Sequence, residues 1–515
     1  MKSRGKEVFI ITLITMLTRV LTLFGVLMYQ TYFGLSNVEL NIFNYAISIP
    51  NYVFTALGTS LTIIVIPIYT SLKAKGDDKR GKKFIDDLIT LTSFLIIIMI
   101  IVSIIFAPAI ISTTEYKNDS YTFGYAVFAL RILLPVMFFF SLRDILVGFL
   151  QANDKFKVAA AVSLPTSLMI IFYIKFFANT YEVKGLMIAN LIGLCLQAFF
   201  LIPSVIKTGY RYKFSFDYKS EDIKNGLKLV PAVLLSTSAY QINMLYNTTM
   251  STFFGAVSMI NLVFNTMLIP VLTLVYSITA VYFPKMSYEW ENDNEENYVN
   301  YLKEIFGVII FLLIPATVGL IVLRFDVMNL LANWGRVTDS ETTLTSNILG
   351  IYSLSIVFVG LKETLDKAFY AQKRTKPSGI VGIIIMLTNI LVIQILKNKF
   401  GAYSIPVGYF ISAFTGSLIL FVLLGKTLKS LRKEMFVKML KCLVSACIMG
   451  IVVYGISILL KAGVQGDGFF IRILVLAIPI FFGVIIYFIS SAVFKIEESL
   501  TIFNKIKLGM RKGKK

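Results

Sequence analysis

The stretch VFIITLITMLTRVLTLFGVLMYQTYF, residues 8–33, is long and apolar enough to cross a lipid bilayer, which takes about 20 mostly apolar residues. Arg19 lies near its middle. A cation at mid-bilayer depth is costly, so we expect this side chain to face protein or water rather than lipid. Either it pairs with polar groups of a neighbouring helix and fixes their packing, or it stands in a water-filled cavity that receives an anionic substrate.

The composition is that of a polytopic membrane protein. Hydrophobic residues make up 57% of the 515 residues and charged residues only 15%, which is too much apolar surface for a soluble protein of this size to keep from water. The net charge is +20, but the basic residues fall in short loops between apolar stretches, so we expect no nucleic-acid partner. With no histidine and no metal-ligand spacing among three cysteines, we expect no cofactor and no enzymatic chemistry.

Fourteen apolar stretches are predicted to be membrane-spanning helices, which makes the fold all-α. Because their number is even, both ends of the chain should lie on one side of the membrane. The stretches lie near residues 8–33, 41–71, 85–112, 122–150, 156–178, 184–207, 224–250, 256–286, 300–325, 343–371, 378–397, 402–425, 437–461 and 469–494.

Lysine and arginine predict the orientation of these spans. The loops after the second, sixth and twelfth spans and the C-terminal tail are rich in both residues, whereas residues 34–40 and 251–256 contain neither. Cytoplasmic loops carry the excess of Lys and Arg, so the even-numbered loops and both termini are predicted to be cytoplasmic.

Two similarities at the same separation indicate an internal repeat. Pro50 and Pro270 each open a proline-bounded helical stretch, and Phe149 and Phe369 lie in the similar strings GFLQA and AFYAQ; both pairs are 220 residues apart. Six spans separate the partners, which predicts two lobes in the same orientation, with the substrate between them and alternating access.

The repeat divides the chain into four predicted parts. Residues 1–220 form an N-lobe, residues 221–430 a C-lobe, residues 431–495 two additional helices outside the repeat, and residues 496–515 a basic cytoplasmic tail.

Further polar residues inside the spans are candidates for the substrate site. Arg131 lies toward the outer end of the fourth span, Asn243 and Asn247 lie in the seventh, and Asn265 lies in the eighth. The amides either line a hydrated cavity or bond across helices.

The tenth span ends with four charged residues. Their i, i+4 spacing predicts the ion pairs Lys362–Asp366 and Glu363–Lys367, as a cytoplasmic belt rather than as a site of transport coupling.

Several strings resemble the MurJ/MviN family of lipid II flippases. LRILLPVMFFFSLRDILVGFLQANDKF (residues 130–156) resembles the family's fourth helix and IYSLSIVFVGLKETLDKAFYAQKRTKP (351–377) its tenth, and IFAPAI (105–110) and VGLIVLRFDVMNLLANWGRVT (318–338) also fit. The family belongs to the multidrug/oligosaccharidyl-lipid/polysaccharide exporter superfamily. The resemblance implies two six-helix lobes around a central cavity, with two extra helices, here within 431–495, forming a groove for a lipid tail.

The chain departs from the family's cationic positions. The family's first helix reads roughly S-R-x-L-G-x-x-R-D; Arg19 keeps its first arginine, but Gly25 and Val26 replace the second Arg-Asp. Residues 54–56 carry no charge where the family has an arginine pair, and Asn265 aligns with another arginine. An acidic position of the family's seventh helix aligns with Asn247. The resemblance leaves Arg19 as the main cation, with Arg131 as a helper.

We therefore expect a flippase that carries an undecaprenyl-diphosphate-linked saccharide, specifically the peptidoglycan precursor lipid II, from the inner to the outer leaflet of the bacterial plasma membrane. Arg19 would bind the diphosphate. The expected partners are this lipid-linked substrate and membrane lipids, the energy source is a coupling ion or the membrane potential, and the protein is expected to be a monomer.

Three alternatives remain open. The cargo could be another lipid-linked polysaccharide unit, of capsule or teichoic acid. A multidrug-type antiporter is disfavoured, because such proteins usually need a membrane carboxylate and the first two spans contain none in their interiors. A non-transporting scaffold for envelope assembly is the third.

Overall fold

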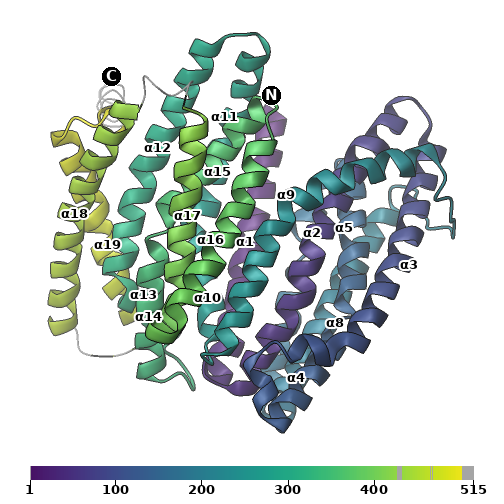
Figure 1. Cartoon of the computed structure of the whole chain (residues 1–515), viewed down its shortest axis with the longest axis horizontal. Helices are drawn as coiled ribbons and strands as arrows, with labels where there is room; N and C mark the ends of the chain where they lie inside the picture. The colour runs from purple at the N-terminus through teal and green to yellow at the C-terminus, as the bar shows by residue number, and fades with distance from the viewer. Residues whose placement is uncertain (1, 426–431, 464–465, 467, 502–515) are drawn as a thin grey trace. The chain divides into compact units, whose positions relative to one another are not determined.

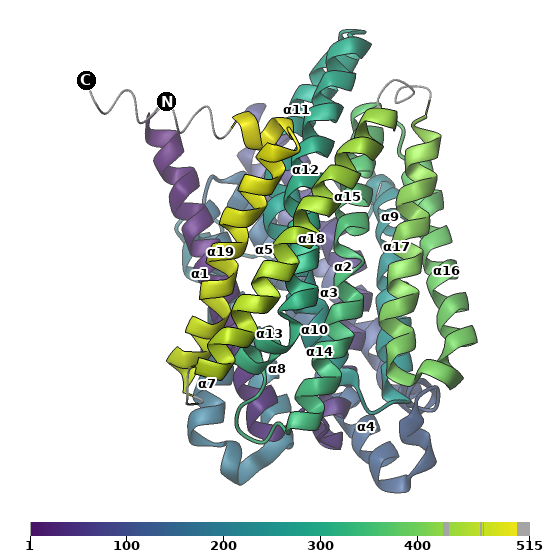
Figure 2. The same cartoon turned by 90° about the vertical axis from the view of Figure 1, so that its left-hand side faces the viewer.

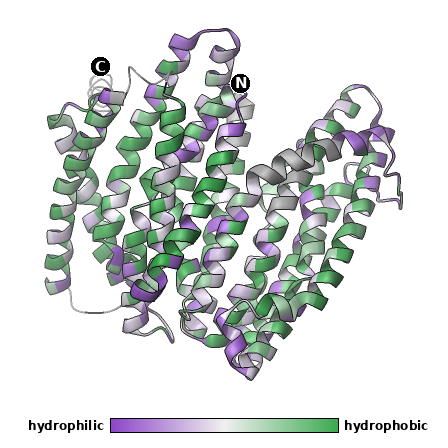
Figure 3. Ribbon diagram, in the orientation of Figure 1, coloured by the Kyte–Doolittle hydropathy of each residue, from purple (hydrophilic) through white to green (hydrophobic). Residues whose placement is uncertain are grey.

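The structure is a computed structural model, and it describes residues 2–425, 432–463, 466 and 468–501. Side chains are placed for all of these except residues 2–9, 12, 56, 57, 59, 60, 63, 227–236 and 432. Every regular element in the described part is helical, and the hydrophilic residues gather at helix ends and in connecting segments (Figure 3). The chain divides into two compact units, residues 1–258 with 335–337, and residues 259–334 with 338–515.

The first unit is built on α2, which packs against α3, α4, α5, α8 and α9 (Figure 1). Gly148 of α5 allows one of these close approaches, since a Cβ there would lie 3.1 Å from Val65 of α2. The helices of this unit are α1 (Lys2–Phe33), α2 (Val38–Ala74), α3 (Asp78–Ile111), η1 (Glu115–Asn118), α4 (Ser120–Leu133), α5 (Val136–Ala152), α6 (Phe156–Ala160), α7 (Leu164–Phe176), α8 (Ala178–Ile206) and α9 (Glu221–Thr252).

The second unit is organised around α12, which packs against α11, α14, α15 and α18. The pair α18 and α19 lies side by side in both views (Figure 1, Figure 2). Its elements are α10 (Val257–Pro270, whose first two residues belong to the first unit), the π-helical η2 (Val271–Val275), α11 (Tyr276–Glu291), α12 (Glu295–Val322), α13 (Arg324–Leu331), α14 (Asp339–Ser353), α15 (Ile356–Ala371), α16 (Lys376–Phe400), η3 (Gly401–Tyr403), α17 (Ser404–Leu423), α18 (Arg432–Gly463) and α19 (Phe469–Val493).

The prediction of an all-α polytopic membrane protein is confirmed, and helix occupies each of the fourteen predicted ranges. Ten stretches of the described residues are long and apolar enough to cross a membrane, or eleven if the bent pair α14 and α15 is one span. One of the ten contains both α16 and α17, and neither α2 nor α9 is among them. The number of crossings therefore stays a prediction.

Two helix breaks repeat at the separation seen in the sequence. α4 ends at Leu133 and α5 begins at Val136, while α14 ends at Ser353 and α15 begins at Ile356, in each case 220 residues further on. The local causes differ. Pro135 has no N–H to continue the first helix, whereas the Ser355 hydroxyl donates to the Tyr352 carbonyl at the second break, where the helices bend by 41°.

Contacts place α9 in the first unit, although the repeat begins its second half with this helix. Two asparagines hold the start of α2 to the start of α10. Asn41 of α2 accepts a hydrogen bond from the backbone N–H of Ser258 (2.8 Å), and Asn44 donates to the Ser258 hydroxyl (2.9 Å). The lobe boundary at residue 220 stays a prediction of the repeat.

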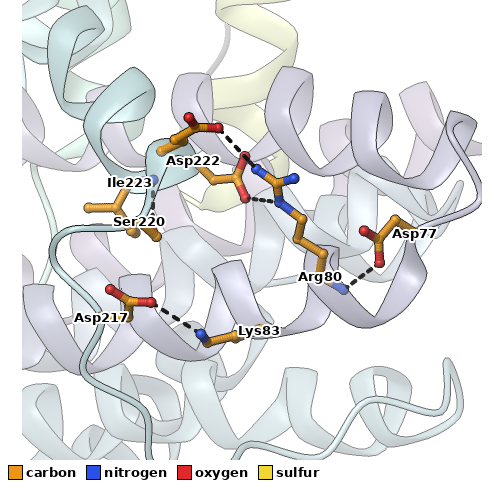
Figure 4. A network of polar contacts seen from close by, with 8 residues as sticks. Asp77, Arg80, Lys83, Asp217, Ser220, Asp222 and Ile223 are labelled. Atoms are coloured by element: carbon orange, nitrogen blue, oxygen red, sulfur yellow. Dashed lines mark hydrogen bonds and ion pairs between the residues drawn. The ribbon is translucent and has the colours of Figure 1, made fainter.

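Ion pairs tie the start of α9 to α3. Arg80 binds both carboxylate oxygens of Asp222, at 2.7 and 3.1 Å, and Lys83 binds Asp217 at 3.1 Å (Figure 4). Ser220 caps α9 by accepting a hydrogen bond from its own helix. Because Arg80 binds both oxygens of Asp222, this contact fixes the orientation of the first turn of α9 relative to α3.

An enclosed ion pair attaches the two additional helices to α12. Lys438 of α18 binds Glu498, which follows α19, and the side chains of both are about 85% buried. Both charges lie against Gly307 of α12, where a Cβ would collide with the Glu498 carboxylate and the Lys438 ammonium. The Tyr487 hydroxyl of α19 also donates to the Phe311 carbonyl of α12 (2.8 Å). The predicted lipid-tail groove stays a prediction, and residues 502–515 of the predicted tail lie outside the described residues.

Replacing Gly307 with alanine should therefore loosen this attachment, because the new methyl group would push the charged ends of Lys438 and Glu498 out of their positions against α12. We expect a lower melting temperature for the detergent-solubilised protein, followed by intrinsic fluorescence.

Gly319→Ala is the matched control on the same helix, since a Cβ there would meet only Met449 Cε at 4.0 Å. Alanine favours a helix over glycine by about 1 kcal/mol, so this variant should be at least as stable as the parent. Equal melting temperatures for both variants would contradict the role given to the ion pair.

Candidate functional site

Arg19 is exposed on α1 and, within the described residues, makes no hydrogen bond or ion pair. The face of α1 next to it is the one that packs against α7: Thr18 is buried, and the Thr22 hydroxyl lies 2.9 Å from Ser167 Oγ. The hydroxyls of Thr18 and Thr22 also donate to their own helix's carbonyls. The packing alternative, in which Arg19 pairs with polar groups of a neighbouring helix, therefore gains no support.

Four of the five large apolar residues that are exposed on the described part of α1 lie on a different side from Arg19. Leu13, Leu17, Val20 and Phe24 form a stripe with exposed fractions between 46% and 65%. At 3.6 residues per turn, Arg19 lies roughly 130° around the helix from the centre of that stripe. A spanning helix turns such a stripe to lipid. Met16, also exposed, lies between the stripe and Arg19, so Arg19 lies beside the lipid-facing side and not at its centre.

Arg131 is also exposed, but it has a partner. Its Nε donates to the backbone carbonyl of Ile104 on α3 at 3.3 Å. Ile101 and Ile105, on either side of that carbonyl, belong to an exposed apolar stripe of α3. The geometry directs this guanidinium to α3, and its role as a helper of Arg19 stays a prediction without structural support.

The three asparagines are divided between the two units. Asn243 and Asn247 lie one turn apart on α9, which packs along α2, and their exposed fractions are only 2% and 4%. Such burial favours bonding between helices over the lining of a hydrated cavity. Asn265 belongs to the second unit; it is exposed and donates to the Asn261 carbonyl of its own helix at 2.9 Å.

The charged residues of the tenth predicted span are paired differently from the prediction. Lys362 binds Asp366 at 2.7 Å, as expected, but Glu363 binds Lys362 at 3.3 Å rather than Lys367. The Lys367 ammonium instead lies 5.6 Å from the centre of the Phe283 ring of α11. The predicted Glu363–Lys367 pair is wrong, because Lys362 reaches both carboxylates and Lys367 has an aromatic partner on another helix.

This pairing leaves the Lys362–Glu363–Asp366 cluster with one negative charge in excess, although Lys367 keeps α15 as a whole neutral. Asp366 is 95% buried, and its Oδ1 atom has no hydrogen-bond partner among the described residues. The hydroxyl of Ser378 on α16 is the polar group that lies beside this carboxylate. By contrast, the neighbours Arg143 and Asp144 of α5 balance each other at 2.8 Å.

Sequence reasoning missed the contacts of Asp86 and Asp87 on α3. Both carboxylates are buried, and they bind the segment that precedes α9. A signal was present: two adjacent carboxylates at the start of the third predicted span are costly unless partners satisfy them. The identity of those partners depends on how a distant loop folds back.

The comparisons with known proteins agree over nearly the whole chain. The model of the family described as "Lipid II flippase MurJ" matches residues 29–491. A lipid II flippase MurJ of Thermosipho africanus is 26% identical over 93% of this chain and 94% of its own. A probable lipid II flippase MurJ of Rickettsia prowazekii is 24% identical over 85% of this chain and 87% of its own.

Solved structures show the same relationship. A lipid II flippase MurJ in an inward closed conformation has a TM-score of 0.79 and 26% identity, covering 94% of this chain and 98% of that one. An inward-facing multidrug resistance MATE family transporter of the MOP superfamily has a TM-score of 0.67 over 82% of this chain, and at 15% identity it shows the fold alone. This protein is a multi-pass membrane protein, and the chain belongs to the MurJ family of lipid II flippases.

Proposed function

We propose that this protein carries lipid II from the inner to the outer leaflet of a bacterial plasma membrane, with both termini in the cytoplasm. Membership of the MurJ family supports the cargo, and the Lys- and Arg-rich loops support the orientation. The proposed mechanism rests on one observation: the guanidinium of Arg19, in the first span, is exposed and has no partner among the described residues.

The chemistry of the headgroup fits an arginine at this position. A diphosphate presents several anionic oxygens, and the planar guanidinium can bind two of them with parallel charge-assisted hydrogen bonds. An ammonium group is a point charge and lacks this fork. The partly satisfied Lys362–Glu363–Asp366 cluster on α15 has no cation to spare, so it is not suited to hold the same anion.

A second candidate cargo is another undecaprenyl-diphosphate-linked saccharide, of capsule or teichoic acid. The observation that favours it is the loss of family cations: Gly25 and Asn265 stand where the family has arginine. Diphosphate binding by Arg19 would be common to both cargoes. Complementation of a strain depleted of its own lipid II flippase separates them, because only a lipid II flippase restores growth.

The membrane potential is the proposed energy source. Moving a negative headgroup outward across an inside-negative potential is downhill by about 2.3 kcal/mol for each charge per 100 mV. The alternative is a coupled cation. Within the described spans, the site that we assign to such a cation is the pair of carboxylates Asp366 and Glu363, which share one ammonium group.

Arg19→Ala should abolish growth in the complementation assay, while Arg19→Lys should retain part of it, since lysine keeps the charge but loses the bidentate geometry. Val20→Ala is the control, because Val20 lies next to Arg19 on the exposed apolar stripe and carries no charge. Membrane levels of all three variants should be measured by immunoblot. Full growth with Arg19→Ala at normal levels would show that Arg19 is not needed for transport.

In proteoliposomes, flipping of fluorescent lipid II should accelerate when a potassium diffusion potential makes the departure side negative, and slow when the potential is reversed. No sodium or pH gradient should be required. Flipping that follows an ion gradient at zero potential, and that is lost in Asp366→Asn, would instead assign energy coupling to the α15 cluster.

A further inference from the structure

The segment KTGYRYKFSFDYK, residues 207–219, connects α8 to α9 and has an unusual pattern. Aromatic residues occupy every second position from Tyr210 to Tyr218, and the segment also contains four cations. The segment forms a turn at residues 207–209 and then runs without helix or strand to residue 217. The cations, all exposed, are Lys207, Arg211, Lys213 and Lys219.

This segment is held in place rather than loose. The buried carboxylates of Asp86 and Asp87 on α3 accept hydrogen bonds from two of its side chains and two of its backbone N–H groups. Burial and the bond to Asp86 raise the pKa of the Tyr210 phenol, which therefore stays a neutral donor. The bonds are Tyr210 Oη to Asp86 (2.6 Å), Lys213 N to Asp86 (3.0 Å), Ser215 Oγ to Asp87 (2.5 Å) and Asp217 N to Asp87 (3.1 Å).

Four of its five aromatic side chains are exposed, and only Tyr210 is buried. Phe214 is 81% exposed, and Tyr212, Phe216 and Tyr218 are each about half exposed. Large exposed apolar groups in a row mark a surface that meets another apolar phase. An anchored backbone that presents four such rings is consistent with a binding surface and not with a solvated linker.

Contacts with α3 show where this surface lies along the spanning helix. The Tyr212 hydroxyl is 2.8 Å from Thr90 Oγ1, and the Phe216 ring stacks edge-on against Phe94 at 6.2 Å between centres. Phe94 is the first residue of the exposed apolar stripe on α3, which continues through Ile97, Ile98, Ile101 and Ile105. The rings of the segment therefore lie level with the point at which α3 enters the hydrocarbon.

We propose that residues 207–219 form a membrane-interface anchor, with Phe214 inserted at the headgroup boundary and the flanking cations bound to anionic phospholipid headgroups of the cytoplasmic leaflet. Aromatic rings and Lys or Arg side chains are the groups that favour this interface and its negative surface potential. Asp217, the one carboxylate of the segment, is already neutralised by Lys83.

The anchor bears directly on α9. It ends one residue before Ser220, the N-cap of α9, and the first turn of that helix is held to α3 by Arg80 and Asp222 (Figure 4). Anionic lipid bound here would hold the start of α9 at a fixed depth. This inference concerns bilayer lipid and does not rest on the identity of the transported cargo.

The insertion is tested by fluorescence of the full chain in nanodiscs, with Phe214→Trp as the probe. Lipids brominated on the acyl chains should quench the added tryptophan strongly, after subtraction of the parent's signal. Tyr288→Trp is the matched control, since Tyr288 is 66% exposed at the hydrophilic end of α11. Equal quenching of the two probes would overturn the proposed insertion.

The lipid preference is tested by hydrogen exchange of peptides covering residues 210–218. Exchange should slow at least about threefold when phosphatidylglycerol replaces about a third of a zwitterionic bilayer. Arg211→Ser combined with Lys213→Ser should remove that difference, whereas Lys117→Ser with Lys399→Ser, which removes two exposed charges elsewhere, should keep it.

Two results would contradict the preference for bilayer lipid. One is identical exchange in the two bilayers. The other is protection that requires an added undecaprenyl-diphosphate lipid and is not produced by phosphatidylglycerol, which would make the segment a substrate contact instead. Neither readout involves flipping, so failure here leaves the proposed transport function untouched, and failure of transport leaves this proposal standing.

Discussion

The cost of placing charge in a low-dielectric environment is the constraint on which most of this structure depends. The buried or partly buried charges described above nearly all have partners. Asp326 of α13, 95% buried, binds Lys461 (2.6 Å) and Ser457 (2.8 Å) of α18, and Lys438 binds Glu498 where Gly307 leaves room. These pairs attach the additional helices α18 and α19 to the rest of their unit. The same contacts therefore neutralise buried charges and hold the helices together.

Among the charges described above, two do not meet this constraint. Arg19 is exposed and lacks a partner among the described residues, away from the centre of the apolar stripe of α1. Asp366 is buried and shares one ammonium with Glu363. In a membrane protein, uncompensated charge inside a span marks a functional site by default. An exposed cation suits a passing anion, and an enclosed excess carboxylate suits a small cation.

Much of the fold could be predicted from the sequence, because hydropathy and helix breaks are local. All fourteen predicted ranges contain helix, and the break at Leu133–Val136 has its counterpart at Ser353–Ile356, at the separation that Phe149 and Phe369 already indicated. The candidate site was predicted less well. Spacing predicted Lys362–Asp366, a contact within one helix, but could not show that Lys367 lies on Phe283 or that Asn243 and Asn247 are buried.

By itself, the sequence determined the membrane location, the helical class, the internal repeat and, through its resemblance to the MurJ family, the family itself. Each of these follows from composition, from periodic or repeated strings, or from the position of charges along the chain. Only the tertiary structure decided which distant groups meet: Asp86 and Asp87 with residues 210–217, Arg80 with Asp222, and Arg131 with the backbone of α3. Such contacts depend on how the helices pack and where the loops run, and residues far apart in the chain determine both. A local sequence pattern therefore cannot predict them.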